Sequence, residues 1–157
     1  MGPGVRPADI SEVEKIVSLW KEFMNDPSAI DEPIPTNEEN AKKQVQLIEE
    51  LIREDPGQVL VAEQAGELVG YLLCRRNQKT ALELRHKMSY IYDLYVRPGH
   101  RRQGVGSSLL KVCLEDLRKA GPRQIRINVW VKNATAIRLY RKMGFQDHLV
   151  VMKADVT

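Results

Sequence analysis

Apolar side chains recur every three or four residues in four segments of the chain, the spacing that gathers them on one face of an α-helix. Either Asp9 or Ser11 could cap the first helix, and Thr36 with Glu39 forms a capping box at the start of the second. The last helix closes at Gly144. We therefore predict four helices, which lie within residues 13–24, 36–52, 106–120 and 133–143.

Short apolar segments rich in β-branched and aromatic residues predict strands. Ala65-Gly66 supplies a tight hairpin turn, and residues 25–35, with three prolines and three acids, are typical of a long loop. The element order β-α-α-β-β-β-α-β-α-β-β predicts an α+β fold with a mixed sheet of about seven strands and four helices. The segments that carry the strand pattern are residues 5–6, 58–64, 67–76, 87–96, 124–131 and 149–153.

Length and composition are those of an ordinary globular protein, and we expect residues 1–157 to form a single domain. No apolar run approaches the ~18–20 residues that a membrane span needs, and the first residues lack the apolar core of an export signal. Cys74 and Cys113 lie in separate apolar segments, without the spacing of a metal site or a redox pair. These features predict a cytoplasmic protein with no membrane partner and with two buried, reduced cysteines.

Charge is distributed unevenly along the chain. Residues 1–64 hold 14 acids and 6 bases, a balance of −8, whereas residues 97–142 hold 12 bases and 2 acids, a balance of +10. This asymmetry describes either two solvated faces of opposite sign or a site where an anionic and a cationic ligand meet. We expect no nucleic-acid partner, because the basic region lacks a helix-turn-helix, a zinc-finger pattern and an aromatic RNA platform.

The stretch RPGHRRQGVGSSLL, residues 97–110, places two glycines and two arginines at the start of a predicted helix. Such a helix start binds anions, because its first N–H groups are unpaired and carry a partial positive charge. Two common nucleotide motifs do not fit. Val105 and Gly106 stand where a Walker loop needs Lys and Ser or Thr, and Leu109 stands where a dinucleotide fingerprint needs its third glycine.

The pattern R-x-x-G-x-G from Arg101 to Gly106, preceded by a strand that ends at Val96, resembles the GNAT superfamily of acyl-CoA N-acyltransferases. A second block, residues 128–145, is similar to that family's later signature V-x-x-x-N-x-x-A-x-x-L-Y-x-x-x-G-F. One helix and one strand separate the two blocks, as in the family, and the likeness covers residues 4–153. The resemblance implies a GNAT fold and a reaction in which an amine attacks the thioester of acetyl-CoA directly.

The implied co-substrate is acetyl-CoA, and no metal is expected, since the three histidines lack metal-ligand spacing. The glycines would let backbone N–H groups approach the pyrophosphate, and strand backbone would pair with the pantetheine arm. Asn133 would hold the same arm, and it also suits a helix N-cap. The residues implied in cofactor binding are Leu94, Tyr95, Val96, Arg101, Arg102, Gln103, Gly104, Val105, Gly106, Ser107, Asn133 and Tyr140.

By the same resemblance, Tyr140 protonates the thiolate leaving group, although its spacing also fits core packing. The base that deprotonates the amine stays open. Members of the family that use a carboxylate or a histidine on this strand carry it at the position of Tyr92, so Tyr92 is kept among the catalytic candidates. Strand alternation puts Tyr92 and Leu94 on one face and Asp93 on the other, which makes Asp93 a structural anchor more than a base.

The acceptor is expected to be a cationic primary amine such as a polyamine, an aminoglycoside, or a protein lysine or N-terminus. The acidic N-terminal half suits such a ligand, and the family builds its acceptor groove there. The candidate substrate-binding residues are Asp31, Glu32, Tyr90 and Tyr92, of which Asp31 and Glu32 are also alternative bases beside a water chain. A non-catalytic acyl-CoA sensor on the same fold is the alternative function, and a homodimer is the oligomer considered.

Overall fold

The structure, a computed structural model, describes residues 4–76, 88–121 and 124–157. Three short 3-10 turns, η1, η2 and η3, accompany the main elements: Ile10–Glu12, Pro56–Gln58 and Pro98–His100. The helices are α1 Val13–Met24, α2 Glu38–Glu54, α3 Val105–Lys119 and α4 Ala134–Lys142. The strands are β1 Gly4–Pro7, β2 Val59–Gln64, β3 Glu67–Arg75, β4 Met88–Val96 and β5 Gln124–Ile127.

The described strands form one mixed sheet in the order β1-β2-β3-β4-β5. Neighbours are antiparallel from β1 to β4, whereas β4 and β5 are parallel and are joined through α3. The hairpin between β2 and β3 turns at Ala65 and Gly66, with φ of 50° and 81°. Two successive positive φ values are what a tight hairpin turn requires. The predicted α+β class is thus confirmed, with fewer strands than expected among the described residues.

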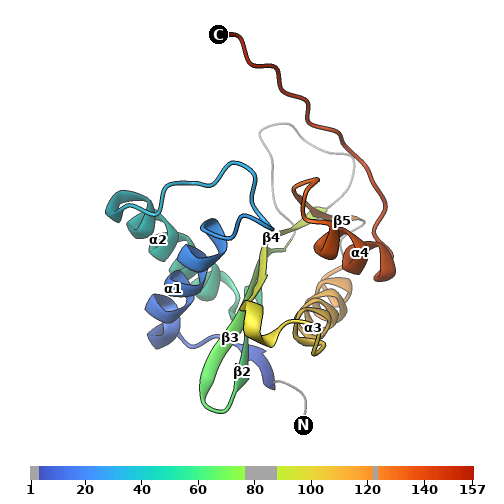
Figure 1. The fold of residues 1–157 in the computed structure, drawn as a ribbon. Coiled ribbons are helices and arrows are strands. Elements are labelled where there is room, and N and C mark those ends of the chain that lie inside the picture. The colour runs from blue at the N-terminus through green and yellow to red at the C-terminus, as the bar shows by residue number, and fades with distance from the viewer. Residues whose placement is uncertain (1–3, 77–87, 122–123) are drawn as a thin grey trace.

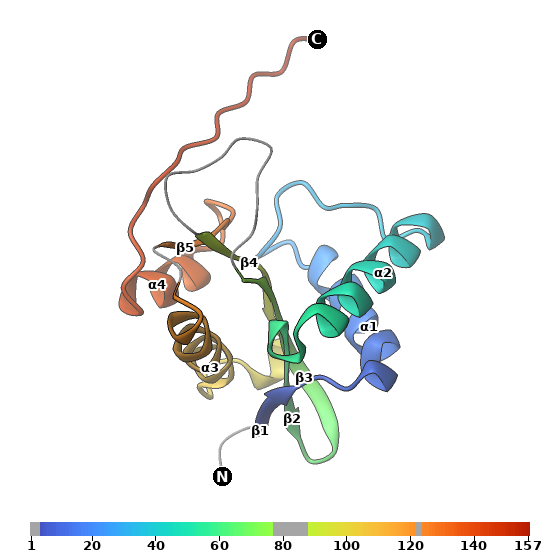
Figure 2. The same cartoon turned by 180° about the vertical axis from the view of Figure 1, so that it is seen from behind.

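Two helical layers enclose the sheet, α1 and α2 on one face and α3 and α4 on the other (Figures 1 and 2). The predicted apolar stripe of α1 is buried against the first face, where Ile16 and Trp20 meet Tyr71 of β3. On the second face, Leu109 and Leu110 of α3 belong to the same buried cluster as Leu72 of β3. The sheet therefore separates two apolar cores, and the site described below lies where β4 and β5 diverge.

The predicted cap at Asp9 agrees with the structure, whereas the cap predicted at Thr36 is wrong by one residue. Asp9 caps η1, and the reciprocal bond from the Asp9 N–H to Glu12 completes a capping box. The capping box expected at Thr36 is wrong. Asn37 is the N-cap of α2, because its side-chain oxygen accepts the Asn40 N–H at 2.8 Å.

Two predicted strands differ from the structure. The strand expected over residues 124–131 ends at Ile127, and the strand expected over 149–153 does not form. Val131 is 90% exposed, and the side chains of Leu149, Val150, Val151 and Met152 are 74–86% exposed. A strand needs a neighbouring strand to satisfy its backbone groups, so an apolar pattern alone did not suffice here.

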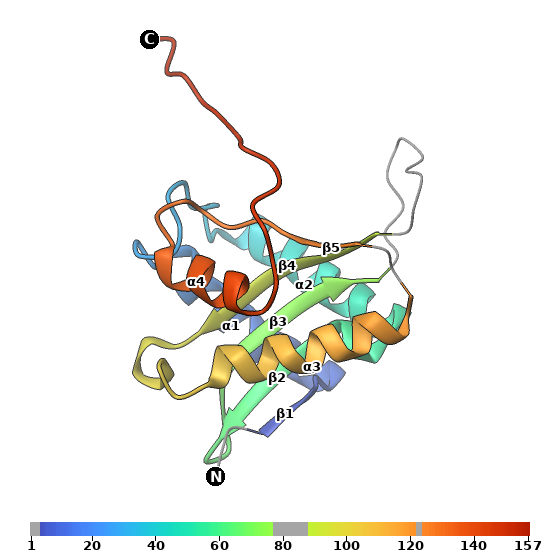
Figure 3. The same cartoon turned by 90° about the vertical axis from the view of Figure 1, so that its right-hand side faces the viewer.

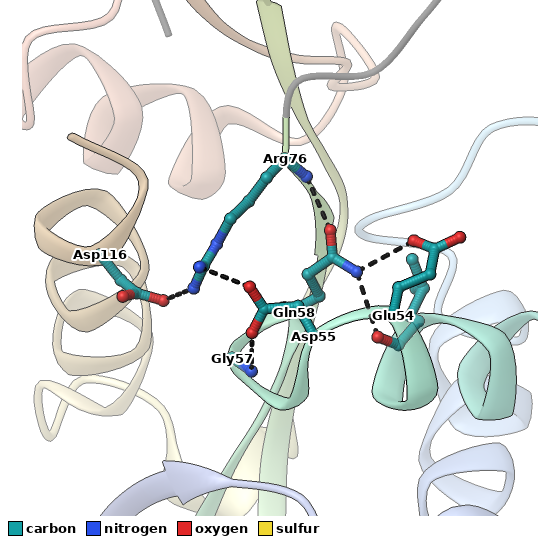
Figure 4. A network of polar contacts seen from close by, with 7 residues as sticks. Glu54, Asp55, Gly57, Gln58, Arg76 and Asp116 are labelled. Carbon is teal, nitrogen blue, oxygen red and sulfur yellow. Dashed lines mark hydrogen bonds and ion pairs between the residues drawn. The ribbon is translucent and has the colours of Figure 1, made fainter. Parts of the chain in front are cut away.

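A polar network at the end of β3 fixes the layers to one another (Figure 4). The Arg76 guanidinium pairs with Asp55 after α2, at 2.6 Å, and with Asp116 of α3. The buried side chain of Gln58 links Arg76 to Leu51 of α2. It accepts the Arg76 N–H at 2.8 Å and donates to the Leu51 carbonyl at 3.1 Å. Because its members come from α2, β3 and α3, the network holds both helical layers at the end of α3 remote from its N-terminus.

Both cysteines are buried as predicted, on β3 and α3, and each is a free thiol. The Cys74 and Cys113 thiols interact with each other, and this contact, together with burial, raises the pKa of Cys113. The helices in the part of the chain described by the structure include none that is both long and apolar enough to span a bilayer.

Candidate functional site

The loop from β4 to α3 presents unpaired backbone N–H groups. Arg102 and Gly104 adopt left-handed conformations, with φ of 62° and 79°, so the loop turns sharply before Val105 begins the helix. Gly104 is the N-cap residue and no side chain caps the helix. A Cβ built at Gly106 would lie 3.5 Å from Leu139, so α3 starts close against α4. The result is an anion-binding helix start with little side-chain cover.

The two arginines of this loop lie in different environments. Arg101 donates from Nε to the Val96 carbonyl at 2.8 Å and pairs with Asp26 at 2.6 Å, and its guanidinium lies 5.6 Å from the centre of the Tyr95 ring. Arg101 thus ties the loop to the segment after α1. Arg102 is exposed, and within the described ranges no ion pair holds it. Of the two predicted cationic contacts, Arg102 is thus the more exposed.

Within the described part of the chain, no strand pairs with the β5-side edge of β4 beyond Ile91. β5 pairs only with Met88–Ile91, whereas β3 follows β4 to Val96. The Arg97 N–H donates to Val69 at 2.9 Å, so alternation turns the N–H groups of Leu94 and Val96 away from β3. These groups face the gap that β5 leaves. Tyr95 has the opposite phase: its backbone faces β3, and its ring stacks on Phe23 with centroids 5.2 Å apart.

A β-bulge in β4 overturns the predicted side-chain alternation. Leu73 pairs with Asp93 and Cys74 pairs with Ile91, so Tyr92 is an extra residue on β4. The prediction that Tyr92 and Leu94 share a face is therefore wrong. Tyr92 packs against the α1–α2 core, and Leu94 packs against the α3 core. A bulge re-aims side chains in this way because two residues oppose one on the neighbouring strand.

Asp93 lies in a buried polar contact that the sequence did not reveal. The Tyr71 hydroxyl, from the neighbouring strand, donates to Asp93 at 2.9 Å. Burial raises the pKa of Asp93 to about 6, and the hydrogen bond from Tyr71 opposes that rise. Tyr71 belongs to a strand whose apolar pattern marked it only as core, so no sequence signal pointed to this pair.

We expect Asp93→Asn to stabilise the protein at high pH. Because folding raises the Asp93 pKa from 3.8 to about 6, the stability that this group contributes is fully present below pH 3.8 and is lost as the pH rises through 6. Asparagine removes the charge and keeps an acceptor for Tyr71. The free energy of unfolding at pH 8 should rise by up to ~3 kcal/mol, with little change near pH 4.

Chemical denaturation at the two pH values measures this effect, and Asp155→Asn, in the exposed C-terminal segment, is the matched control. An Asp93→Asn protein that is no more stable than wild type at pH 8 would contradict a buried, costly carboxylate at this position.

Tyr140 faces the α3 core and is only 6% exposed. Its ring packs on Phe145 with centroids 5.9 Å apart, and the Phe145 N–H donates to its carbonyl at 3.0 Å. Burial and the charge of Asp93 raise the pKa of Tyr140, which keeps the hydroxyl protonated at neutral pH. Asn133 is the N-cap of α4, and its Oδ1 accepts the Ala136 N–H at 3.2 Å.

The acids of the loop after α1 have basic partners from distant parts of the chain. Burial opposes ionisation of Asp26, but hydrogen bonds from Ser28 and Arg101 outweigh it and lower the Asp26 pKa. Glu32 pairs with Lys153 at 2.7 Å, and Asp31 lies 3.9 Å from Lys132, the residue before Asn133. This loop therefore reaches the α4 side of the gap beside β4.

Tyr90 and Tyr92 stack with centroids 6.5 Å apart and rings nearly parallel at 8°. Burial raises the pKa of Tyr92, and the neighbouring Arg75 opposes this rise. A neutral phenol so placed is a poor proton acceptor at pH 7, which favours a contact role for Tyr92 over that of a base. The remaining predicted residues of the helix start divide by exposure: Gln103 and Ser107 are exposed, and Val105 is buried.

Metal ligands were not predicted, and the residues described in the structure contain no group of three or more His, Cys, Asp or Glu side chains placed to hold an ion. His86 lies outside the described residues. The other two histidines differ in setting, since His100 contacts Gln64 at 2.7 Å and His148 is exposed.

Comparison with known proteins shows the family and the fold of the chain. The model of the Acetyltransferase (GNAT) family matches residues 16–145. An uncharacterised N-acetyltransferase of Methanocaldococcus jannaschii is 32% identical over 64% of this chain and 44% of its own length. An N-alpha-acetyltransferase of Sulfurisphaera tokodaii is 31% identical over 62% of each chain. The chain thus spans less than two thirds of these relatives.

A solved aminoglycoside N-acetyltransferase in complex with CoA has the same fold. It superposes with a TM-score of 0.72 at 15% identity, over 99% of this chain and 97% of that chain.

Proposed function

The chain belongs to the acetyltransferase (GNAT) family, and from this premise we propose that it transfers the acetyl group of acetyl-CoA to a primary amine. The observation that carries the proposal is a pair of open backbone arrays within the described residues: the uncapped first turn of α3, and the outward N–H groups of Leu94 and Val96 on the β4 edge that β5 does not reach. The two arrays are adjoining, because only the 97–104 loop separates them. A ligand with a pyrophosphate next to an amide-bearing arm fits both.

The residues present suit each part of that ligand. The N–H groups of Gly104, Val105 and Gly106 would receive the pyrophosphate, with Arg102 as the cationic contact. The outward N–H group of Val96 and the outward carbonyl of Leu94 would pair with the amide-bearing arm, as an added strand would, which leaves the Leu94 N–H for the reacting carbonyl. Arg101 would act indirectly, since its bonds to Val96 and Asp26 hold the loop in place.

The reaction requires the removal of a proton from the amine and the delivery of a proton to the thiolate leaving group. An alkyl amine with a pKa near ~10 is protonated at pH 7 and must lose a proton before it attacks. Three acids are candidates for this step: Asp93, which is buried and accepts a hydrogen bond from Tyr71, and Asp31 and Glu32, which form ion pairs with lysines. The Leu94 N–H would stabilise the oxyanion, and Tyr140 would protonate the thiolate.

A cationic acceptor is supported by the acids and tyrosines on the α1–α2 side. Tyr90 and Tyr92 offer a stacked aromatic surface, and Asp31 and Glu32 flank the gap. An acetyl-CoA consumption assay over a panel of polyamines, aminoglycosides and peptides tests the proposal. Turnover with a cationic amine is expected. Tight acetyl-CoA binding without turnover of any amine would instead favour the sensor function.

We further expect Asp31→Asn with Glu32→Gln to raise KM for a polyamine by about 3- to 10-fold at low salt, with kcat little changed. The acids attract a cation over a Debye length of ~10 Å, so the effect should shrink as ionic strength rises. Lys132→Gln with Lys153→Gln is the matched variant, because it frees the same two acids and should lower KM. A KM that changes neither with these four substitutions nor with ionic strength would rule out this electrostatic role.

A further inference from the structure

Asp26 belongs to neither open backbone array, yet it contacts the 97–104 loop directly. Its carboxylate Oδ2 accepts a hydrogen bond from Arg101 Nη2 at 2.6 Å, and its side chain is only 11% exposed. Salt screens such an ion pair little, and breaking it would leave a charge partly buried without its partner. Asp26 lies in the loop between α1 and α2, residues 25–37, which we call the α1–α2 loop. Figure 3 shows this loop, in blue, and the 97–104 loop, in yellow, on the left, where β4 ends.

The other contacts of Arg101 fix the point where β4 passes into the 97–104 loop. Its Nε donates to the carbonyl of Val96, the last residue of β4, at 2.8 Å, and its guanidinium lies 5.6 Å from the centre of the Tyr95 ring. The next residue, Arg102, has a φ of 62°, a conformation that a residue other than glycine adopts at a cost. The bonds of Arg101 therefore support a turn that is strained without them.

The remaining hydrogen bonds of Asp26 organise the α1–α2 loop. Its Oδ1 accepts the Ser28 N–H at 3.0 Å and the Ser28 hydroxyl at 2.6 Å. Its carbonyl accepts the N–H groups of Ala29 at 3.1 Å and of Ile30 at 3.0 Å, and these two side chains are buried in the α1–α2 core. Asp31 follows Ile30 directly. A turn built by Asp26 thus carries an acid that is proposed to meet the amine.

We propose that Asp26 is a positioning residue, which couples the binding of the acyl donor to the arrangement of the α1–α2 loop. The inference rests on the proposed function. A donor seated on the first turn of α3 needs the turn at residues 102–104, and the same turn places Arg101 against Asp26. Donor binding would therefore favour the ion pair and order residues 26–32, and by linkage an ordered α1–α2 loop would favour the donor. One ion pair would thereby join the donor and acceptor sides of the site.

Amide hydrogen exchange, followed by mass spectrometry with and without saturating acetyl-CoA, tests the coupling. In the wild-type protein, acetyl-CoA should slow exchange at residues 102–108 and also at residues 26–32, the latter by ~5-fold or more, the lower end of the range for coupled sites. In Asp26→Asn the protection of residues 26–32 should be lost. The protection of residues 102–108 should remain, because saturating ligand still occupies the first turn of α3.

Glu22→Gln is the matched control. Glu22 pairs with Arg97 at 3.1 Å, so it also joins α1 to the start of the 97–104 loop, but through an ion pair that does not include Arg101. This variant should keep the protection of residues 26–32. Arg101→Gln breaks the proposed pair from its other side and should lose that protection as Asp26→Asn does, so the test does not depend on the folding of a single variant. The double variant should show no further loss, since both substitutions remove one interaction.

Three results would overturn the inference. If acetyl-CoA protects residues 102–108 of the wild-type protein but not residues 26–32, the two loops are uncoupled and the proposed donor site stands. If Asp26→Asn speeds exchange at residues 26–32 by the same factor with and without acetyl-CoA, Asp26 only stabilises its own loop. If acetyl-CoA protects neither segment of the wild-type protein, the proposed donor site is wrong and the coupling fails with it.

Discussion

Gly104→Val is expected to reduce acetyl-CoA affinity by more than about 100-fold. Gly104 has a φ of 79°, which a β-branched residue adopts only with strain of ~1–3 kcal/mol. The loop would relieve this strain by rotating, and rotation turns the N–H groups at the start of α3 away from the pyrophosphate. Hydrogen bonds to charged groups contribute about 1.5–3 kcal/mol each, so the loss of one or two accounts for the expected change. Calorimetric titration with acetyl-CoA measures it.

Gly99→Val is the matched control in the same loop. Gly99 has no positive φ, and a Cβ built there would meet no atom within 4 Å. The Gly99→Val protein should bind acetyl-CoA with an affinity near that of wild type. A folded Gly104→Val protein, verified by circular dichroism, that binds acetyl-CoA as tightly as the control would remove the loop from the binding site.

Tyr140→Phe should lower kcat by roughly 100-fold, the lower end of the range for general acid–base catalysis. The substitution keeps the ring that packs on Phe145 and removes only the hydroxyl. That hydroxyl makes no side-chain hydrogen bond with the residues that the structure describes, so neither the fold nor acetyl-CoA affinity should change much.

The measurement is steady-state turnover with the best amine from the panel, alongside thermal unfolding and acetyl-CoA titration. Unchanged kcat would identify Tyr140 as a packing residue and move the proton donor elsewhere. A loss of kcat accompanied by an equal loss of acetyl-CoA affinity would point to binding instead of proton transfer.

Features that depend on neighbouring residues in the sequence were predicted well. The apolar stripe of α1, the hairpin at Ala65 and Gly66, and the glycine-rich start of α3 are each set by a few consecutive residues. Local spacing and backbone preference suffice to specify them. The same holds for the candidate anion site, because its N–H groups belong to one loop and one helix turn.

Features that depend on distant residues were not predicted. The bulge at Tyr92 exists only in relation to β3, so strand alternation gave the wrong face. The ion pair of Arg101 with Asp26, 75 positions away in the chain, was not predicted, and the expected contact of Arg101 with the ligand stays a prediction. The strand expected at residues 149–153 does not form, because an apolar pattern does not specify a neighbouring strand with which to pair.

The extra residue in β4 separates the two sides of the candidate site, so that a mutation can act on one side alone. At the bulge, Tyr92 turns its side chain toward the α1–α2 core, whereas beyond it Leu94 and Val96 present backbone groups to the gap. Backbone groups are retained whatever side chain a mutation brings. In the proposed site, substitutions on the Tyr92 side would therefore change the acceptor side and leave unchanged the backbone groups that face the acyl donor. A single inserted residue thus lets mutation change one side of the proposed site without changing the other.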